Sequence, residues 1–247
     1  MNIHNEHEKI LGILGGVGTL ATAFFVTKLA KRTDARTDQE HVTYICLNHA
    51  KVPDRTAWLI GESKEDPRPV IADGLRFLQE AGADVIAIPC NTSHCFFDDL
   101  QSRVEVPVIN MAESAVRRIT GNDPDARAVG ILATTGTVTT GLYQGIAAAQ
   151  GLEAIIPDEA DQALLMKIIY DDVKSGNEAD ADTAGFLAVA DRLLARGADA
   201  LIVACTELSV LCDLNYGLFG GRKLVDAMDV LVEESIIKSG KKLKIAP

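Results

Sequence analysis

One stretch occurs twice in this chain, first as Gly82-Ala-Asp-Val-Ile-Ala-Ile-Pro-Cys-Asn-Thr92 and again as Gly197-Ala-Asp-Ala-Leu-Ile-Val-Ala-Cys-Thr-Glu207. Both copies open with Gly-Ala-Asp, continue through a short apolar segment and reach a cysteine eight residues after the glycine. A short apolar run after a capping glycine predicts a buried strand, so Cys90 and Cys205 are expected just past strand ends. Cysteines at two equivalent positions indicate a chemistry that needs two equivalent groups.

A second pair of similar segments shows that the repeat is larger than one strand. Residues 12–19, Gly-Ile-Leu-Gly-Gly-Val-Gly-Thr, match residues 130–137, Gly-Ile-Leu-Ala-Thr-Thr-Gly-Thr, at five of eight positions. The first segment begins 78 residues before Cys90, and the second begins 75 residues before Cys205. Two pairs of similar segments at nearly the same separation indicate an internal duplication.

Short apolar segments alternate with helical patterns throughout both halves. The expected strands are 9–14, 41–47, 84–88 and 107–110 in the first half and 128–132, 153–157 and 201–204 in the second, and residues 224–226 belong to the tail. The expected helices are 20–32, 67–81, 113–119, 161–196 with an interruption near 175–177, and 227–238. This alternation predicts an α/β fold, here two pseudo-symmetric doubly wound parallel-sheet domains that face each other across a cleft.

The loops at the carboxyl ends of the strands are expected to line this cleft, because ligands of open parallel sheets bind there. We expect residues 1–112 plus 215–247 to form an N-terminal lobe that carries Cys90. Residues 113–214 then form a C-terminal lobe that carries Cys205, and the tail helix packs back onto the first half.

The composition narrows the classes of partner. The chain has 247 residues, 47% hydrophobic content and a formal net charge of −11, which is unfavourable for binding nucleic acid or an anionic membrane. The polar N-terminus lacks the apolar core of a signal peptide, and no apolar run approaches the ~18 residues of a membrane span. Five cysteines without a framework spacing predict reduced thiols and a cytoplasmic location.

The glycine loop after the first strand has two interpretations. Gly16-Val-Gly-Thr-Leu-Ala21 fits the dinucleotide fingerprint G-x-G-x-x-A. A nucleotide site also needs an acidic residue at the end of the second strand to hold the ribose, and this strand ends Leu47-Asn-His49. A loop whose backbone N–H groups receive a carboxylate explains the glycines equally well.

Cys90 and Cys205 are the strongest candidates for catalysis. A cysteine between a strand end and a helix N-terminus gains from the helix dipole, which favours the thiolate. The alternative is a buried free cysteine that packs as a small hydrophobic side chain. Two cysteines at equivalent positions, each followed by hydrogen-bonding residues, favour the functional interpretation. Cys46 and Cys212 are expected in the core, and Cys95 is expected to be a packing residue.

No metal site is expected. Cys90, His94 and Cys95 lie close together, but their spacing does not match a C-x-x-C zinc motif, and no second pair supplies further ligands. We expect His94 in a position that is either solvated or satisfied within the core. The spacings of a phosphate-binding P-loop, a serine nucleophile and paired glycosidase carboxylates are also missing from the sequence.

Two positively charged residues lie next to turn residues and not on the polar face of an amphipathic helix. Arg55 follows the second expected strand within Pro-Asp-Arg-Thr, and Lys174 lies where the long helical region breaks. Each residue by itself has two interpretations, a surface charge or a group that holds a substrate carboxylate. The planar fork of an arginine suits a carboxylate especially well.

These motifs together resemble the aspartate/glutamate racemase superfamily, and within it the cofactor-independent aspartate racemase branch. The matching segments are 12–16 with 20–22, 38–41, 53–56, 65–69, 89–92 with 94, 132–137, 173–174 with 176–177, and 205–207. A glutamate racemase carries Asp-Ser after the first strand and Cys-Thr-His at the second cysteine, whereas this chain has Gly-Val and Cys-Thr-Glu. Val17, Thr19 and His49 depart from the pattern of the branch, on loops that are expected to touch the ligand.

The resemblance implies a racemase of a small dicarboxylic amino acid, aspartate above all, that uses no pyridoxal phosphate or other cofactor. Inversion removes a proton from one face of Cα and returns one to the other face, and the resemblance assigns these two roles to Cys90 and Cys205. It implies that Glu207 orients Cys205 or receives the substrate ammonium. The expected substrate-binding residues are Val17, Arg55, Asn91, Thr92, Thr134, Lys174, Thr206 and Glu207. The family also suggests a homodimer.

Other functions share these motifs. They are racemisation of glutamate or of a broad range of amino acids, hydantoin racemisation or maleate isomerisation on the same fold, and non-catalytic binding of a small molecule. Arg55 and Lys174 favour a dicarboxylate over a hydantoin, and a binding protein leaves the paired cysteines unexplained. Because Asn91-Thr92 follows one cysteine and Thr206-Glu207 the other, the two thiols are not expected to be equally basic.

Overall fold

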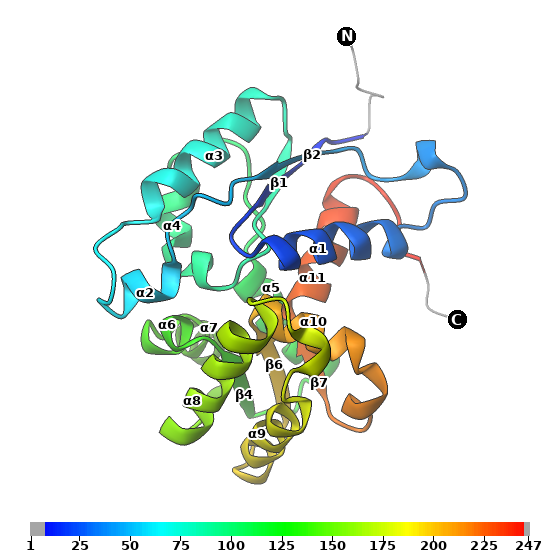
Figure 1. The fold of residues 1–247 in the computed structure, drawn as a ribbon. Coiled ribbons are helices and arrows are strands. Elements are labelled where there is room, and N and C mark those ends of the chain that lie inside the picture. Colours follow the sequence, from blue (N-terminus) through cyan, green and yellow to red (C-terminus); the bar gives the residue numbers. More distant parts are fainter. Residues whose placement is uncertain (1–7, 245–247) are drawn as a thin grey trace.

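The computed structural model describes residues 8–244 and has the expected α/β fold with two parallel sheets (Figure 1). Two strands of each sheet are buried at every position, β1 (Leu11–Gly15) and β3 (Val85–Ala87) in the first half and β4 (Ala128–Ala133) and β6 (Ala200–Ala204) in the second. The sheet orders are β2-β1-β3 and β5-β4-β6-β7, and all pairings are parallel. The other strands are β2 Tyr44–Asn48, β5 Glu153–Ile155 and β7 Leu224–Asp226.

Helices cover both faces of each sheet, which explains why the central strands are apolar at every position. In β1, Leu11 and Ile13 pack in a core shared with the second sheet, whereas Leu14 packs in a separate core on the opposite face. The α-helices are α1 Thr19–Arg32, α2 Arg55–Leu59, α3 Arg68–Glu80, α4 Phe97–Gln101, α5 Met111–Asn122, α6 Thr135–Thr139, α7 Leu142–Ala149, α8 Glu159–Lys167, α9 Thr183–Ala195, α10 Thr206–Leu214 and α11 Ala227–Lys238.

The strand expected over residues 107–110 is reduced to a single parallel bridge between Val108 and Ile86. Its neighbours explain why it is so short. Pro107 has no N–H to donate to a ladder, and the Asn110 side chain accepts a hydrogen bond from Glu113 N and so begins α5. The bridge still occupies the fourth position of the first sheet, which matches the place of β7 in the second.

The last helix of each half crosses toward the other sheet. α5 packs against β6 and β7. α11 packs against α1 and β3 of the first half and also against β6 and β7, and α5 and α11 contact each other in the middle of the molecule (Figure 1). The packing of the tail helix onto the first half is therefore confirmed. The assignment of residues 224–226 to the N-terminal lobe is wrong, because this strand, β7, pairs with β6. The duplication gives the reason, since the second sheet needs β7 as its fourth strand.

The expectation that Cys46 lies in the core is also wrong. β2 is an edge strand whose alternate residues Tyr44, Cys46 and Asn48 are exposed. An edge strand that is packed on one face turns every second side chain toward solvent. Cys212 is buried as expected, and Cys95 is half-buried.

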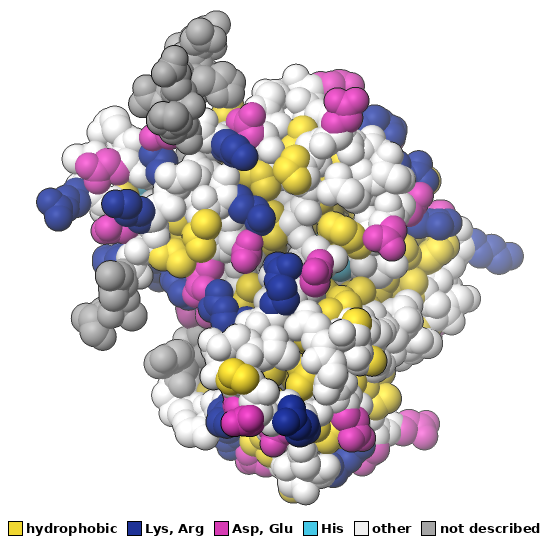
Figure 2. Space-filling view, turned by 180° about the vertical axis from the view of Figure 1, so that it is seen from behind, with side chains coloured by type: hydrophobic (Ala, Val, Ile, Leu, Met, Phe, Trp, Pro, Cys, Tyr) yellow, Lys and Arg dark blue, Asp and Glu magenta, His cyan; other side chains and the backbone are white. Residues whose placement is uncertain are grey.

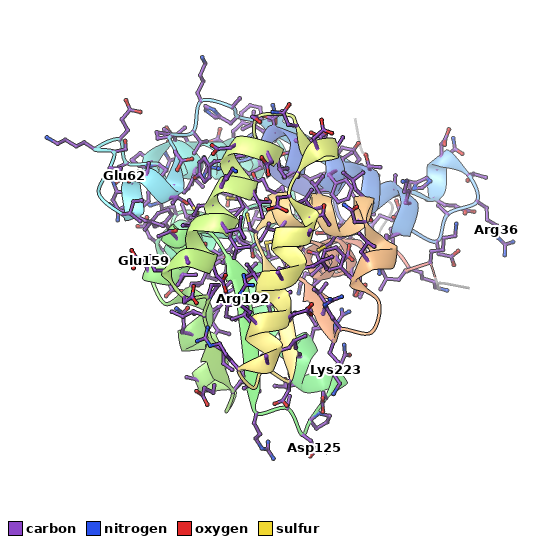
Figure 3. The ribbon with its side chains drawn as sticks, turned by 60° about the horizontal axis from the view of Figure 1, so that its bottom comes forward. Arg36, Glu62, Asp125, Glu159, Arg192 and Lys223 are labelled. Carbon is purple, nitrogen blue, oxygen red and sulfur yellow. The ribbon has the colours of Figure 1, made fainter. Side chains whose placement is uncertain are left out.

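The long helical region of the second half is interrupted, as predicted. After Lys167 it continues as a π-helical segment, Ile168–Val173, and the chain then turns at Gly176, which has φ 86°. Such π-helical turns are frequent at functional sites. Arg192, which is labelled on α9 in Figure 3, donates to Asp161 of α8, with Nε and Oδ2 2.7 Å apart. This contact joins the helices on either side of the interruption.

The surface carries charges of both signs. On the face shown in Figure 2, Lys and Arg side chains stand beside Asp and Glu side chains, with apolar side chains between them. This face offers no continuous basic surface for a nucleic acid. Within residues 8–244, no helix combines the length and the apolar character that are needed to cross a bilayer.

Candidate active site

The carboxyl ends of β3 and β6 bring the two repeated cysteines to one small cavity between the halves. Every residue that the sequence indicates as catalytic or substrate-binding lines this cavity, and Asp54, Thr56 and Tyr170 line it as well. The residues expected there were Val17, Arg55, Cys90, Asn91, Thr92, Thr134, Lys174, Cys205, Thr206 and Glu207. The duplication explains why the two cysteines lie in one cavity, because each follows the third strand in the order of its own sheet.

The cavity is closed to a substrate. Its free volume of about 10 Å³ leaves room for roughly one water molecule. A wider space of about 320 Å³, here called the vestibule, is lined in part by Gly18, Leu20 and Val173. Four side chains border both spaces: Asp54, Arg55, Lys174 and Glu207. A substrate therefore reaches the thiols from the vestibule only when these side chains move or the lobes separate.

Cys90 lies beside a cation. Burial lowers the pKa of the neighbouring Arg55, but the charges of Cys90, Asp54 and Glu207 and a hydrogen bond to Cys90 outweigh burial and raise that pKa overall. Backbone carbonyls hold much of the guanidinium fork, and Nη2 donates to Val17 O at 2.8 Å. Arg55 Nε is buried without a hydrogen-bond partner in the described part of the chain. This N–H remains free to donate to a ligand.

Cys205 lies beside an anion. It is the N-cap residue of α10 and is only 3% exposed. Its Sγ donates to Glu207 Oε2 at 3.2 Å, and Thr206 Oγ1 donates to the same oxygen at 3.1 Å. Burial, followed by the Glu207 carboxylate, raises the pKa of the Cys205 thiol well above its usual value, and Lys174 offsets only part of this effect. Cys205 therefore holds its proton at neutral pH.

Asp54, Tyr170 and Lys174 join the two lobes at the mouth of the cavity. Tyr170 Oη donates to the Asp54 carboxylate at 3.1 Å, and Lys174 Nζ lies 3.6 Å from Asp54 Oδ2 and 3.7 Å from the centre of the Tyr170 ring. Burial lowers the pKa of Lys174, but Glu207, Tyr170 and Asp54 raise it overall. Lys174 thus presents a permanent positive charge where the cavity meets the vestibule.

Three threonine hydroxyls also connect the lobes. The Oγ1 atoms of Thr92, Thr134 and Thr137 lie 3.0 to 3.2 Å from one another. Helix α6, which begins after Thr134, approaches the first lobe so closely that a Cβ on Gly136 would lie 3.0 Å from Thr56 Cα. The absence of a side chain at Gly136 allows this close contact, which brings hydroxyls from both lobes to one wall of the cavity.

His94 is buried and satisfied by the core, which is one of the two positions expected for it. Nδ1 lies 2.9 Å from Cys90 O, Nε2 lies 3.2 Å from Ile109 O, and burial lowers the pKa of the ring. The ring therefore supports the turn that carries Cys90. Among the described residues, no group of three or more His, Cys, Asp or Glu side chains is arranged to hold a metal ion.

Five residues of this region were not predicted from the sequence: Asp54, Thr56, Thr137, Tyr143 and Tyr170. Asp54 precedes a short helix and accepts from Ala57 N at 2.8 Å, so its N-cap position was a usable signal. Thr137 belongs to a duplicated segment. Tyr143 contacts Asn91 and Tyr170 contacts Asp54, each across the boundary between the lobes. A contact between residues that are distant in the sequence leaves no local sequence pattern.

Comparison with known proteins agrees with the resemblance that the sequence motifs indicate. The Asp/Glu/hydantoin racemase family model matches residues 14–235. The chain belongs to this family. This racemase is 28% identical over 212 residues to the broad specificity amino-acid racemase RacX of Bacillus subtilis, which covers 83% of the chain and 88% of the relative. The class of its reaction is therefore isomerisation.

Solved structures show the same fold. The Picrophilus torridus aspartate racemase is 32% identical and superimposes with a TM-score of 0.82 over 96% of each chain. An aspartate racemase homologue from Pyrococcus horikoshii is 22% identical and has a TM-score of 0.73, with 94% of this racemase and 99% of that chain covered. The two-sheet architecture is thus that of known racemases.

Proposed function

We propose that this racemase interconverts L- and D-aspartate by a two-base mechanism in which Cys90 and Cys205 are the acid and the base. The observation that carries the proposal is one cavity in which two buried thiols face opposite charges, Arg55 beside Cys90 and Glu207 beside Cys205. Aspartate is the substrate named for the Picrophilus torridus relative. Arg55 and Lys174 suit a substrate with a second carboxylate.

The charges around the two thiols decide where the single thiolate forms. Cys205 keeps its proton because burial and Glu207 oppose its ionisation. We therefore assign the role of the base to Cys90, which lies beside the Arg55 guanidinium. The Cys90 thiolate then takes the α-proton from one face of the substrate, and the Cys205 thiol gives its own proton to the opposite face. The reaction leaves a thiol at Cys90 and a thiolate at Cys205, and proton exchange with water restores the resting state.

Removal of the α-proton places negative charge on the α-carboxylate of the substrate, and this charge needs donors. Asn91 Nδ2 is buried and has no hydrogen-bond partner within residues 8–244. The hydroxyls of Thr92 and Thr134 lie on the same cavity wall. Donors that are already in place stabilise such charge without reorganisation. Arg55 Nε and Lys174 Nζ are assigned to the second carboxylate.

A broader substrate range is the second candidate. RacX is named a broad specificity racemase, and the apolar side chain of Val17 lines the cavity. An apolar wall at this position accepts a neutral side chain as readily as the methylene of aspartate. The chemistry at Cα is the same in both cases.

Exchange of the α-proton distinguishes the two candidates. The protein is incubated in D₂O, without added cofactor, with each enantiomer of aspartate, glutamate, alanine and leucine, and the α-proton signal is followed by NMR. Faster loss of signal from aspartate than from the other amino acids supports the proposal, and similar rates support the broad range. Exchange with none of these amino acids contradicts both.

A further inference from the structure

Tyr143 is a fully buried tyrosine of the second lobe whose hydroxyl contacts the first lobe. It lies in the first turn of α7 and packs in the core that contains side chains from both sheets. Its Oη donates a hydrogen bond to Oδ1 of Asn91, the residue directly after Cys90. The hydroxyl has no second acceptor within hydrogen-bonding distance among residues 8–244.

Asn91 is buried as well, with 3% of its surface exposed, and it lines the cavity that holds both thiols. Tyr143 satisfies its Oδ1, but its Nδ2 has no partner in the described part of the chain. A buried amide group without a partner costs free energy unless a ligand supplies an acceptor. The unsatisfied atom therefore points to a ligand acceptor in this cavity.

The hydrogen bond also decides which way the Asn91 amide is turned. If the amide were flipped, its NH₂ group would donate to Tyr143 Oη, and the hydroxyl proton would be left without an acceptor. Burial raises the pKa of Tyr143 well above its usual value, and Asp226, Cys95 and Cys205 raise it further. The hydroxyl therefore remains a donor, and it favours the orientation in which Asn91 Oδ1 faces Tyr143.

We propose that Tyr143 is a positioning residue, whose hydroxyl holds the Asn91 side chain so that its NH₂ group faces the carboxylate of the bound substrate. The inference rests on the proposed racemase function and adds a residue to it. Tyr143 neither touches the substrate nor exchanges a proton with it, and it acts through Asn91. Because the two residues belong to different lobes, the donor is oriented only when α7 lies against the turn that follows β3.

Substitution of Tyr143 by phenylalanine tests this role by removing only the hydroxyl. We expect Tyr143→Phe to lower kcat for aspartate about 10- to 100-fold with a much smaller change in KM, since the loss of an oriented donor acts mainly on the transition state. Asn91→Ala should lower kcat at least as much. The double variant should be no slower than Asn91→Ala within about twofold, because the hydroxyl has nothing left to orient.

A variant that also loses a buried hydroxyl, but far from the cavity, serves as the matched control. Ser235 is fully buried on α11 and donates to Leu231 O at 2.7 Å, so Ser235→Ala should lower the melting temperature and leave kcat unchanged. The proposal is overturned if Tyr143→Phe keeps the wild-type kcat, or if its effect multiplies with that of Asn91→Ala. Absence of α-proton exchange in the wild type instead overturns the racemase function, and this inference with it.

A measurement on the unsubstituted protein keeps the test decisive even if Tyr143→Phe does not fold. In protein labelled with ¹⁵N at asparagine, the Asn91 NH₂ resonance is assigned by its loss in Asn91→Ala. We expect this resonance to shift when aspartate is added to saturation. A resonance that does not shift overturns the proposal.

Discussion

Substitution of Glu207 by glutamine removes the anion that opposes ionisation of Cys205. In the wild type, a thiolate at Cys205 would stand 3.2 Å from Glu207 Oε2. Two unit charges at this distance repel each other by about 5 kcal/mol at an effective dielectric constant of about 20. Lys174 attracts the same thiolate and offsets part of this repulsion. The substitution should therefore make the ionisation of Cys205 easier by up to about 5 kcal/mol.

The consequence is a shift in the pH dependence of racemisation. The mechanism needs one thiolate and one thiol, so activity rises as the pair loses its first proton and falls as it loses the second. Glu207 raises the pKa of Cys205 in the wild type and so keeps the second loss at high pH. In Glu207→Gln the alkaline limb of kcat/KM should move to lower pH, and part of the resting thiolate should move from Cys90 to Cys205.

Two assays check this expectation. The first measures kcat/KM for both enantiomers of aspartate as a function of pH. The second measures alkylation of Cys90 and Cys205 by iodoacetamide with peptide mass spectrometry, and Cys205 should react faster in Glu207→Gln than in the wild type. Glu62→Gln, at an exposed carboxylate away from the cavity, is the control and should change neither result. An alkaline limb that stays in place, or that moves to higher pH, would refute the role given to Glu207.

Three further predictions concern the mouth of the cavity and the core. Arg55→Lys loses the planar guanidinium group, whose Nη2 donates to Val17 O, and kcat/KM for aspartate should fall at least about tenfold in steady-state kinetics. Tyr170→Phe loses a hydrogen bond to the Asp54 carboxylate, and KM should rise about three- to tenfold with kcat nearly kept, as measured by the same kinetics. Ile202→Ala truncates a fully buried side chain of β6 and should cost about 2–5 kcal/mol in urea unfolding.

The duplication made most of the fold and the centre of the site predictable. Apolar runs that end at Cys90 and Cys205 predicted strands at equivalent positions of two sheets, and ligands of such sheets bind at the carboxyl ends of the strands. The polar residues around these strand ends therefore converge on one cavity. Local sequence was sufficient here, because each of these residues lies within a few positions of a strand end.

Other features could not be predicted because they depend on packing between distant segments. The place of β7 in the second sheet follows from its pairing with β6, a contact that the sequence of the tail does not encode locally. Cys46 was expected in the core, but β2 is an edge strand whose alternate side chains face solvent. Tyr143 and Tyr170 look like ordinary core and surface tyrosines until the lobes are brought together.

The central claim is that two thiols act from opposite faces of one carbon. The most direct measurement starts from L-aspartate in D₂O and determines the deuterium content of each enantiomer at low conversion by chiral mass spectrometry. The two-base mechanism predicts that the D-aspartate formed carries deuterium at Cα, that the remaining L-aspartate keeps its proton, and that Cys90→Ala and Cys205→Ala form no D-aspartate. Product that retains the original proton, or full activity in either variant, would contradict it.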